Sequence, residues 1–213
     1  MSEKNNDIYE QDNIIEANES GGKPSASKNS FAKELIAQAE LIVIAFSIII
    51  LLFSFVARTC QVKGISMENT LYDKEFVVVS NLLYSPQRED IIVFHQTGAK
   101  YNEPVVKRVI GLPGDTVKIE YISNTSMKVT VTDKDGNVTI LEEDYANYSS
   151  SSRPSFYKDS VTYVEEGTIF VMGDNRNDSA DSRDPYIDLV DQRRILGKVV
   201  LRIFPFSRFG TVN

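Results

Sequence analysis

An unbroken apolar run at residues 41–57, LIVIAFSIIILLFSFVA, constrains this chain more than any other feature. Only Ser47 and Ser54 interrupt it, and it carries no charge. A run of this length is at the short end of what crosses a bilayer, and Arg58 can extend it by reaching to the interface. Because a helix that is apolar on every face must be covered on every face, we predict a transmembrane anchor over residues 34–58 rather than a buried core helix.

A cleavable signal sequence fits the same run poorly. The run begins about forty residues into the chain and is longer than the apolar region of a usual signal sequence, and Phe55 and Ala57 do not form a small-x-small pair at its end. Charge does not decide the orientation, since three basic residues lie within twenty positions of the run on each side. No second long apolar run follows, so we expect one crossing.

Composition excludes several classes of function. The net charge of -7 and the pI of about 4.9 argue against a nucleic-acid partner, which would need a basic face. The single cysteine, Cys60, allows neither an intramolecular disulfide nor a cysteine-based metal site. The single histidine, His95, rules out a His-x-x-x-His metalloprotease, and a Ser-His-Asp triad would have to use it. We therefore expect no metal and no cofactor.

The rest of the chain divides into a polar tail and a strand-rich region. Residues 1–33 are mostly polar, with many Asn, Ser, Glu and Lys residues, and this composition predicts a disordered tail. Beyond the apolar run, short segments rich in β-branched residues predict strands, separated by turn signals such as Pro113-Gly114. The predicted strands are 76–79, 91–94, 105–110, 128–132, 138–141, 161–164, 168–172 and 196–204. The soluble part is therefore expected to be mostly β.

Four short segments stand out as candidates for chemistry. In chain order they are GISM at 64–67, KRVIGLPGD at 107–115, GDNR at 173–176 and SADSR at 179–183. Each segment by itself is weak evidence for catalysis. A serine after a membrane span is usually a solvated hydroxyl, and a lysine in a strand is usually an exposed charge. Together, their order along the chain and their position directly after a predicted membrane anchor make them stronger evidence for a catalytic site.

These segments resemble the type I signal peptidase family, in its short Gram-positive form with one span. The resemblance implies antiparallel sheets in a barrel-like catalytic core, at residues 59–213 outside the cytoplasm, with a cytoplasmic N-terminus. Residues 116–170 would be a small cap-like insertion. It also implies a membrane-bound serine endopeptidase that removes signal peptides from secreted preproteins after small-x-small sites. Its partners would be these preproteins and the lipid bilayer.

The residues support the chemistry that the resemblance implies for Ser66 and Lys107. A serine hydroxyl needs a base to become a nucleophile. Because the chain has one histidine, a Ser-Lys dyad is the simpler choice for this base. A lysine acts as a base only if burial brings its pKa down toward neutrality. In a strand, Lys107 shares a face with Val105 and Val109, which supplies apolar surroundings.

The resemblance assigns roles to further residues by position. Ser179 matches the family serine that orients the lysine amine. The pairs Arg108 with Asp174 and Asp181 with Arg183 match structural ion pairs near the site. The Ser66 backbone N–H and a second donor near Gly64 would form the oxyanion hole.

Three departures from the family pattern put the shape of the substrate pocket in doubt, and two rival functions stay open. The departures are Asn69 where the family has proline, Glu89-Asp90 in place of Gly-Asp, and the inverted order Asn177-Asp178. The first rival is a self-cleaving repressor of the related Ser-Lys fold, which would carry a soluble N-terminal arm instead of a span. The second is a membrane-tethered binding module that has lost activity.

Overall fold

The computed structural model describes residues 26–96, 103–151, 154 and 157–212, and it gives no side-chain placement for 26–30 and 52–56. The chain separates into two compact units, residues 1–48 and 49–213, and each is described by itself. Residues 1–25, where most of the predicted tail falls, lie outside the described part of the chain.

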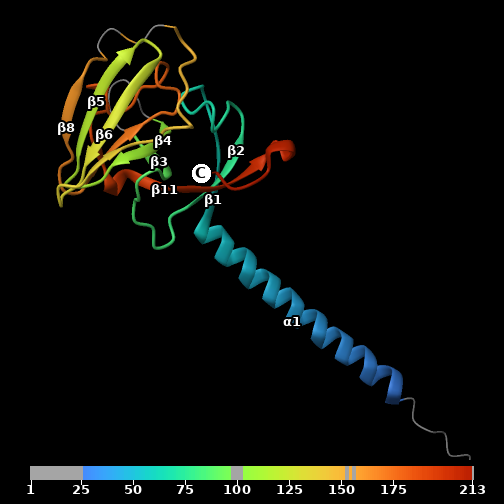
Figure 1. The fold of residues 1–213 in the computed structure, drawn as a ribbon. Coiled ribbons are helices and arrows are strands. Elements are labelled where there is room, and N and C mark those ends of the chain that lie inside the picture. The colour runs from blue at the N-terminus through green and yellow to red at the C-terminus, as the bar shows by residue number, and fades with distance from the viewer. Residues whose placement is uncertain (1–25, 97–102, 152–153, 155–156, 213) are drawn as a thin grey trace, which may run out of the picture. The chain divides into compact units, whose positions relative to one another are not determined.

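A single long helix, α1 (Ala26–Val56), contains the predicted anchor (Figure 1). Its stretch Phe31–Leu51 is long and apolar enough to cross a membrane, and none of that stretch is buried against protein. A core helix would be covered by protein, so this finding favours the anchor. The predicted bounds need correction at both ends. The helix begins at Ala26 instead of 34, and it ends at Val56 because Ala57 is already paired in a strand.

The larger sheet has seven strands, and every neighbouring pair is antiparallel. Its spatial order is β1 (Ala57–Gln61), β2 (Phe76–Ser80), β11 (Ile195–Phe204), β3 (Ile91–His95), β4 (Pro104–Gly111), β9 (Thr168–Met172) and β10 (Val190–Asp191). The last long strand, β11, therefore lies between two early ones and joins the β1–β2 pair to the rest of the sheet (Figure 1).

A second, four-stranded antiparallel sheet is formed within the segment that the resemblance predicts as an insertion. Its order is β7 (Val138–Ile140), β6 (Ser126–Thr132), β5 (Thr116–Ser123) and β8 (Ser160–Tyr163). Buried residues of β5 and β6 share one apolar cluster with Ile110 of β4 and Phe170 of β9. This shared cluster packs the second sheet against strands β4 and β9 of the first. Two short 3-10 helices complete the fold, Gln192–Arg194 and Phe206–Arg208.

The mostly β fold with one N-terminal helix confirms the predicted class, and each predicted strand overlaps an observed one. Three observed strands were not predicted: β1, β5 and β10. In β5 the buried Val117 and Ile119 alternate with charged residues, which is the pattern of a half-buried strand that sequence reasoning missed. In β1 the sequence ARTCQ has no clear alternation, and pairing with β2 defines the strand.

A buried apolar cluster fixes the loop that carries the first candidate segment. Val62, Met67 and Leu71, from the connection between β1 and β2, are buried together with Val79 and Val199 of the sheet. Burying side chains of this size gives each about 1.5–3 kcal/mol of transfer free energy. The connection is thus packed on the sheet, and Ser66 lies between two of its anchored residues.

Candidate active site

Ser66 is held by its backbone as well as by its packed neighbours. The backbone N–H of Asn175 donates to the carbonyl oxygen of Ser66 at 3.0 Å. The side-chain amide of the same asparagine donates to the carbonyl oxygen of Ile65 at 3.1 Å. Two hydrogen bonds from one residue therefore clamp the serine loop to the segment after β9.

Lys107 lies in the middle of β4, directly opposite Ile92 of β3. Its Nζ is 2.7 Å from Ser66 Oγ and 2.8 Å from the carbonyl oxygen of Val106. As predicted from alternation, Val105 and Val109 belong to one apolar cluster, which also contains Ile92. The side chain of Lys107 is thus buried among apolar residues and next to the hydroxyl of Ser66.

Burial sets the ionisation of this lysine. Lys107 is 3% exposed, and desolvation of the ammonium lowers its pKa from 10.5 to about 8. The negative charges of Asp181 and Asp174 oppose this effect by favouring the charged amine, and Arg183 adds to it. At mildly basic pH a large fraction of Lys107 is therefore neutral and has a lone pair available to accept a proton.

A cavity of about 780 Å³ opens beside the pair. Its walls come from residues 60–63 at the end of β1 and residues 103–107 at the start of β4, and Ser66 and Met67 also line it. The two walls are extended segments, a geometry that suits an extended peptide lying between them. The cavity therefore brings Ser66 Oγ within reach of a bound chain.

The two predicted ion pairs are both formed and both buried. Arg108 donates from Nε and Nη2 to the two carboxylate oxygens of Asp174, at 2.9 and 2.8 Å. Arg183 binds Asp181 in the same bidentate manner, at 2.8 Å for both hydrogen bonds. Burial alone would raise the pKa of Asp181, but the pairing with Arg183 lowers it below its ordinary value. Both ion pairs lie buried near the Ser66–Lys107 pair, and their structural role stays a prediction.

Ser179 lies close to the pair but has a different partner from the predicted one. Its hydroxyl donates to Asp181 at 2.8 Å, and the described part of the chain holds no hydrogen bond between Ser179 and Lys107. Gly173 shows how tightly this region is packed, because a Cβ there would lie 2.2 Å from Ser179 Oγ and 2.5 Å from the Ser66 carbonyl oxygen. The lysine-orienting role of Ser179 stays a prediction.

Gly64 does not offer a free donor in this structure. Its backbone N–H donates to Asp73 Oδ1 at 2.8 Å, and its φ of +85° suits glycine. Among the described residues, the backbone N–H of Ser66 has no hydrogen-bond acceptor. The backbone N–H of Ser66 is therefore available as a donor, whereas that of Gly64 is engaged by Asp73, and the predicted oxyanion hole stays a prediction.

Sequence reasoning did not assign several residues that shape the site. Asn175 lies within the GDNR segment, but neither its residue type nor the resemblance gave it a role. Tyr145 stacks on Arg108 with the guanidinium carbon 3.9 Å from the ring centroid, and Glu143 forms an ion pair with the fully buried Arg176. Both come from the stretch between the predicted strands 138–141 and 161–164, and no local signal marked them.

A Ser-His-Asp triad would have to use His95, and a metal site would need several ligating side chains close together. His95 ends β3 opposite Pro104 and does not line the cavity that contains Ser66. No group of three or more potential metal-ligating His, Cys, Asp or Glu residues occurs in the part of the chain that the structure describes.

Comparison with known proteins places the chain in a family. The sequence model of the signal peptidase family, peptidase S26, matches residues 35–204. Signal peptidase IB of Staphylococcus aureus strain Mu50 is 34% identical over 193 residues, covering 83% of this chain and 93% of the relative. Signal peptidase I of Leptolyngbya laminosa is 32% identical over 200 residues, covering 90% of each. A crystal structure of a signal peptidase I from Enterococcus faecalis V583 is 30% identical and covers 55% of this chain and 98% of that one, with a TM-score of 0.40.

The chain therefore belongs to the signal peptidase family, peptidase S26, whose members are serine endopeptidases. This confirms the family and the enzyme class that the four sequence segments predicted.

Proposed function

We propose that this chain removes N-terminal signal peptides from secreted preproteins, with Ser66 as the nucleophile and Lys107 as the general base. The observation that carries the proposal is the 2.7 Å separation of Ser66 Oγ and Lys107 Nζ at the edge of a peptide-sized cavity. Family membership supports signal peptide removal by a serine protease.

In the proposed reaction, neutral Lys107 accepts the Ser66 hydroxyl proton as Oγ forms a bond to the scissile carbonyl carbon. The resulting oxyanion is stabilised by the Ser66 backbone N–H, which lacks another acceptor among the described residues. Lys107 then gives its proton to the amine of the leaving mature protein as the C–N bond breaks, leaving an acyl ester on Ser66. Water, activated by the same lysine, hydrolyses the ester and frees the signal peptide.

The carbonyl oxygens of Ser66 and Ile65 are fixed by Asn175, so the nucleophile is preorganised before substrate arrives. We propose that the peptide lies extended between residues 60–63 and 103–106, and that small side chains flank the scissile bond.

The direct test is cleavage of a purified preprotein, with a small-x-small site, by the full-length chain in detergent. Ser66→Ala should lower the cleavage rate by about 10³-fold or more, because losing either member of a dyad removes nearly the whole rate. Ser207→Ala is the matched control, since it removes an exposed hydroxyl outside the cavity. Cleavage by Ser66→Ala within tenfold of wild type would exclude Ser66 as the nucleophile, and a folded wild type without cleavage would favour a binding module.

We also propose that α1 crosses the membrane with its N-terminus in the cytoplasm and residues 59–213 outside. The support is the apolar helix and the membrane anchorage of the homologues. Protease added to intact spheroplasts should digest a C-terminal tag and spare an N-terminal one. Protection of the C-terminal tag until the membrane is permeabilised would show the opposite orientation.

A further inference from the structure

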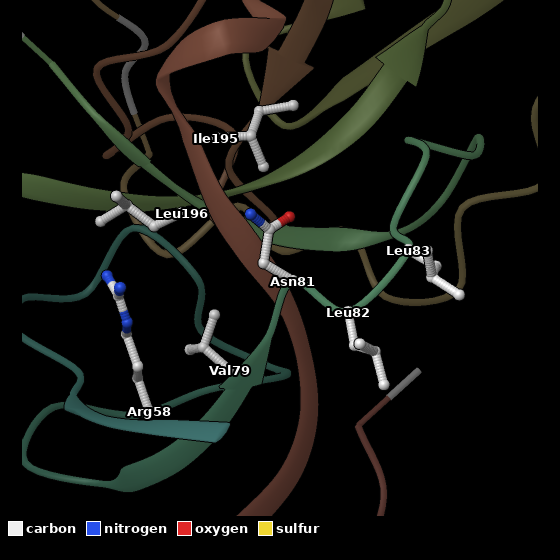
Figure 2. Close-up of a pocket in the computed structure, with 7 residues that line it drawn as sticks. All are labelled: Arg58, Val79, Asn81, Leu82, Leu83, Ile195 and Leu196. Atoms are coloured by element: carbon white, nitrogen blue, oxygen red, sulfur yellow. The ribbon is translucent and has the colours of Figure 1, made fainter. Parts of the chain in front are cut away.

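Figure 2 shows a second cavity, of about 320 Å³, which shares no lining residue with the cavity that contains Ser66. Arg58 of β1 and Asn81 after β2 supply its polar groups, and Leu82, Leu83 and Leu196 are among the apolar residues that line it. Neither the peptidase chemistry nor the core accounts for this combination. We propose that the cavity binds a membrane phospholipid, with the phosphate on Arg58 and Asn81 and the start of an acyl chain on the leucines.

Chain connectivity keeps this cavity close to the bilayer surface. The stretch suited to crossing a membrane ends at Leu51, and the helical rise from there to Ala57 is about 9 Å. Ala57 pairs with Ser80 across β1 and β2. Because paired strand residues lie about 5 Å apart and successive Cα atoms 3.8 Å apart, Leu83 lies within about 17 Å of Ala57. These lengths place the cavity within reach of lipid headgroups.

Arg58 is exposed and positioned for an anion. Among the described residues, no hydrogen bond or ion pair engages its guanidinium. Other arginines of this unit, such as Arg108 and Arg183, are paired with carboxylates. A guanidinium presents a fork of donors that matches the oxygens of a phosphate, and the amide of Asn81, which lines the same cavity, can add a further donor.

Leu83 supplies an independent observation. Its side chain is 98% exposed, so it contributes nothing to the core, and its φ of +50° lies in the left-handed region. A non-glycine residue in this region costs on the order of 1 kcal/mol, and asparagine tolerates it better than leucine. Leu82 beside it is also mostly exposed. Two exposed leucines that line the same cavity as Arg58, which has no carboxylate partner among the described residues, fit an acyl chain as the occupant.

The experiment uses the full-length chain with Ser66→Ala in detergent, so that its outcome does not depend on the proposed peptidase function. Leucine methyl NMR follows the addition of dihexanoyl phosphatidylglycerol. Leu141, which follows β7 and packs in the apolar cluster of the second sheet, is the internal reference outside the cavity. Glycerol 3-phosphate tests the phosphate alone, and dihexanoyl phosphatidylcholine tests the chains with a neutral headgroup. We expect saturable shifts at Leu82 and Leu83 with the anionic lipid, and at least tenfold weaker binding of glycerol 3-phosphate.

Variants test separately the polar residues proposed to bind the phosphate and the leucines proposed to bind the acyl chain. Arg58→Gln should weaken lipid binding about tenfold or more, Arg58→Lys should weaken it less, and Leu83→Asn should weaken it several-fold while keeping the backbone geometry. Lys134→Gln is the charge-matched control, because Lys134 is exposed in the β6–β7 hairpin, and it should change nothing. Equal binding by wild type and Arg58→Gln would overturn the proposal. Equal binding of glycerol 3-phosphate and the lipid would also overturn it, by reducing the cavity to a simple anion site.

Discussion

Strand β4 places two buried cations on opposite faces, and the protein handles them in opposite ways. Lys107 and Arg108 are consecutive and only 3% and 2% exposed. Arg108 is bound by the carboxylate of Asp174, whereas the partners of Lys107 among the described residues are a serine hydroxyl and a backbone carbonyl. Burial of a charge must be offset by pairing or avoided by neutralisation. The difference fits our proposal that Lys107 takes part in proton transfer, while the pairing of Arg108 with Asp174 contributes stability.

The largest expected effect is on the face that carries Lys107. Lys107→Ala should lower preprotein cleavage by about 10³-fold or more, since Ser66 then has no base. Lys107→Arg should lower cleavage to the same extent, because a guanidinium stays protonated and cannot act as a base. The cleavage rate of each purified variant, with Lys118→Ala as an exposed lysine control, provides the measurement. Cleavage by Lys107→Arg near the wild-type rate would remove the distinction between the two faces.

On the other face, breaking the ion pair should cost stability. Asp174→Asn leaves Arg108 buried without a charged partner, and we expect a loss of about 3–5 kcal/mol in the free energy of unfolding. Urea unfolding of the full-length chain in detergent measures the change. The double variant Arg108→Leu with Asp174→Leu should recover part of the loss, because it removes both charges. A double variant less stable than Asp174→Asn would contradict this account.

The pH dependence of kcat/KM sharpens the comparison by reporting the ionisation of Lys107. With a pKa of about 8, the neutral amine is the minor form at pH 7, and the rate should fall about tenfold per unit below pH 8. His95→Ala should leave this ascending limb and most of the rate in place. A limb near pH 6.5 that disappears in His95→Ala would instead identify the histidine as the base.

The smallest expected effect is a gain in stability. Lys107→Met should raise the free energy of unfolding by about 1–2 kcal/mol at pH 7, because the folded protein no longer buries an ammonium. The gain should shrink from pH 8 to 10.5, where the lysine is already neutral in the folded state but still protonated in the unfolded one. Thermal unfolding at pH 7 and 10 tests this, and a loss of stability at pH 7 would contradict it.

The sequence by itself determined the local features of this protein. The apolar run specified a helix long enough to cross a membrane, and β-branched segments specified most of the strands, because these signals lie within a few consecutive residues. Alternation along residues 105–109 also predicted that Lys107 lies among valines. The four motifs identified the family, and the paired arginines and aspartates in them are joined as the resemblance implied.

Only the tertiary structure decided which groups meet. Asn175 clamps a carbonyl 110 positions earlier in the chain, Ser179 donates to Asp181, and the Gly64 N–H is engaged by Asp73. The insertion of β11 between β2 and β3 brings together strands from the two ends of the soluble unit. Local patterns cannot specify such contacts, because each depends on sheet order, register and the direction of a side chain after distant segments have packed.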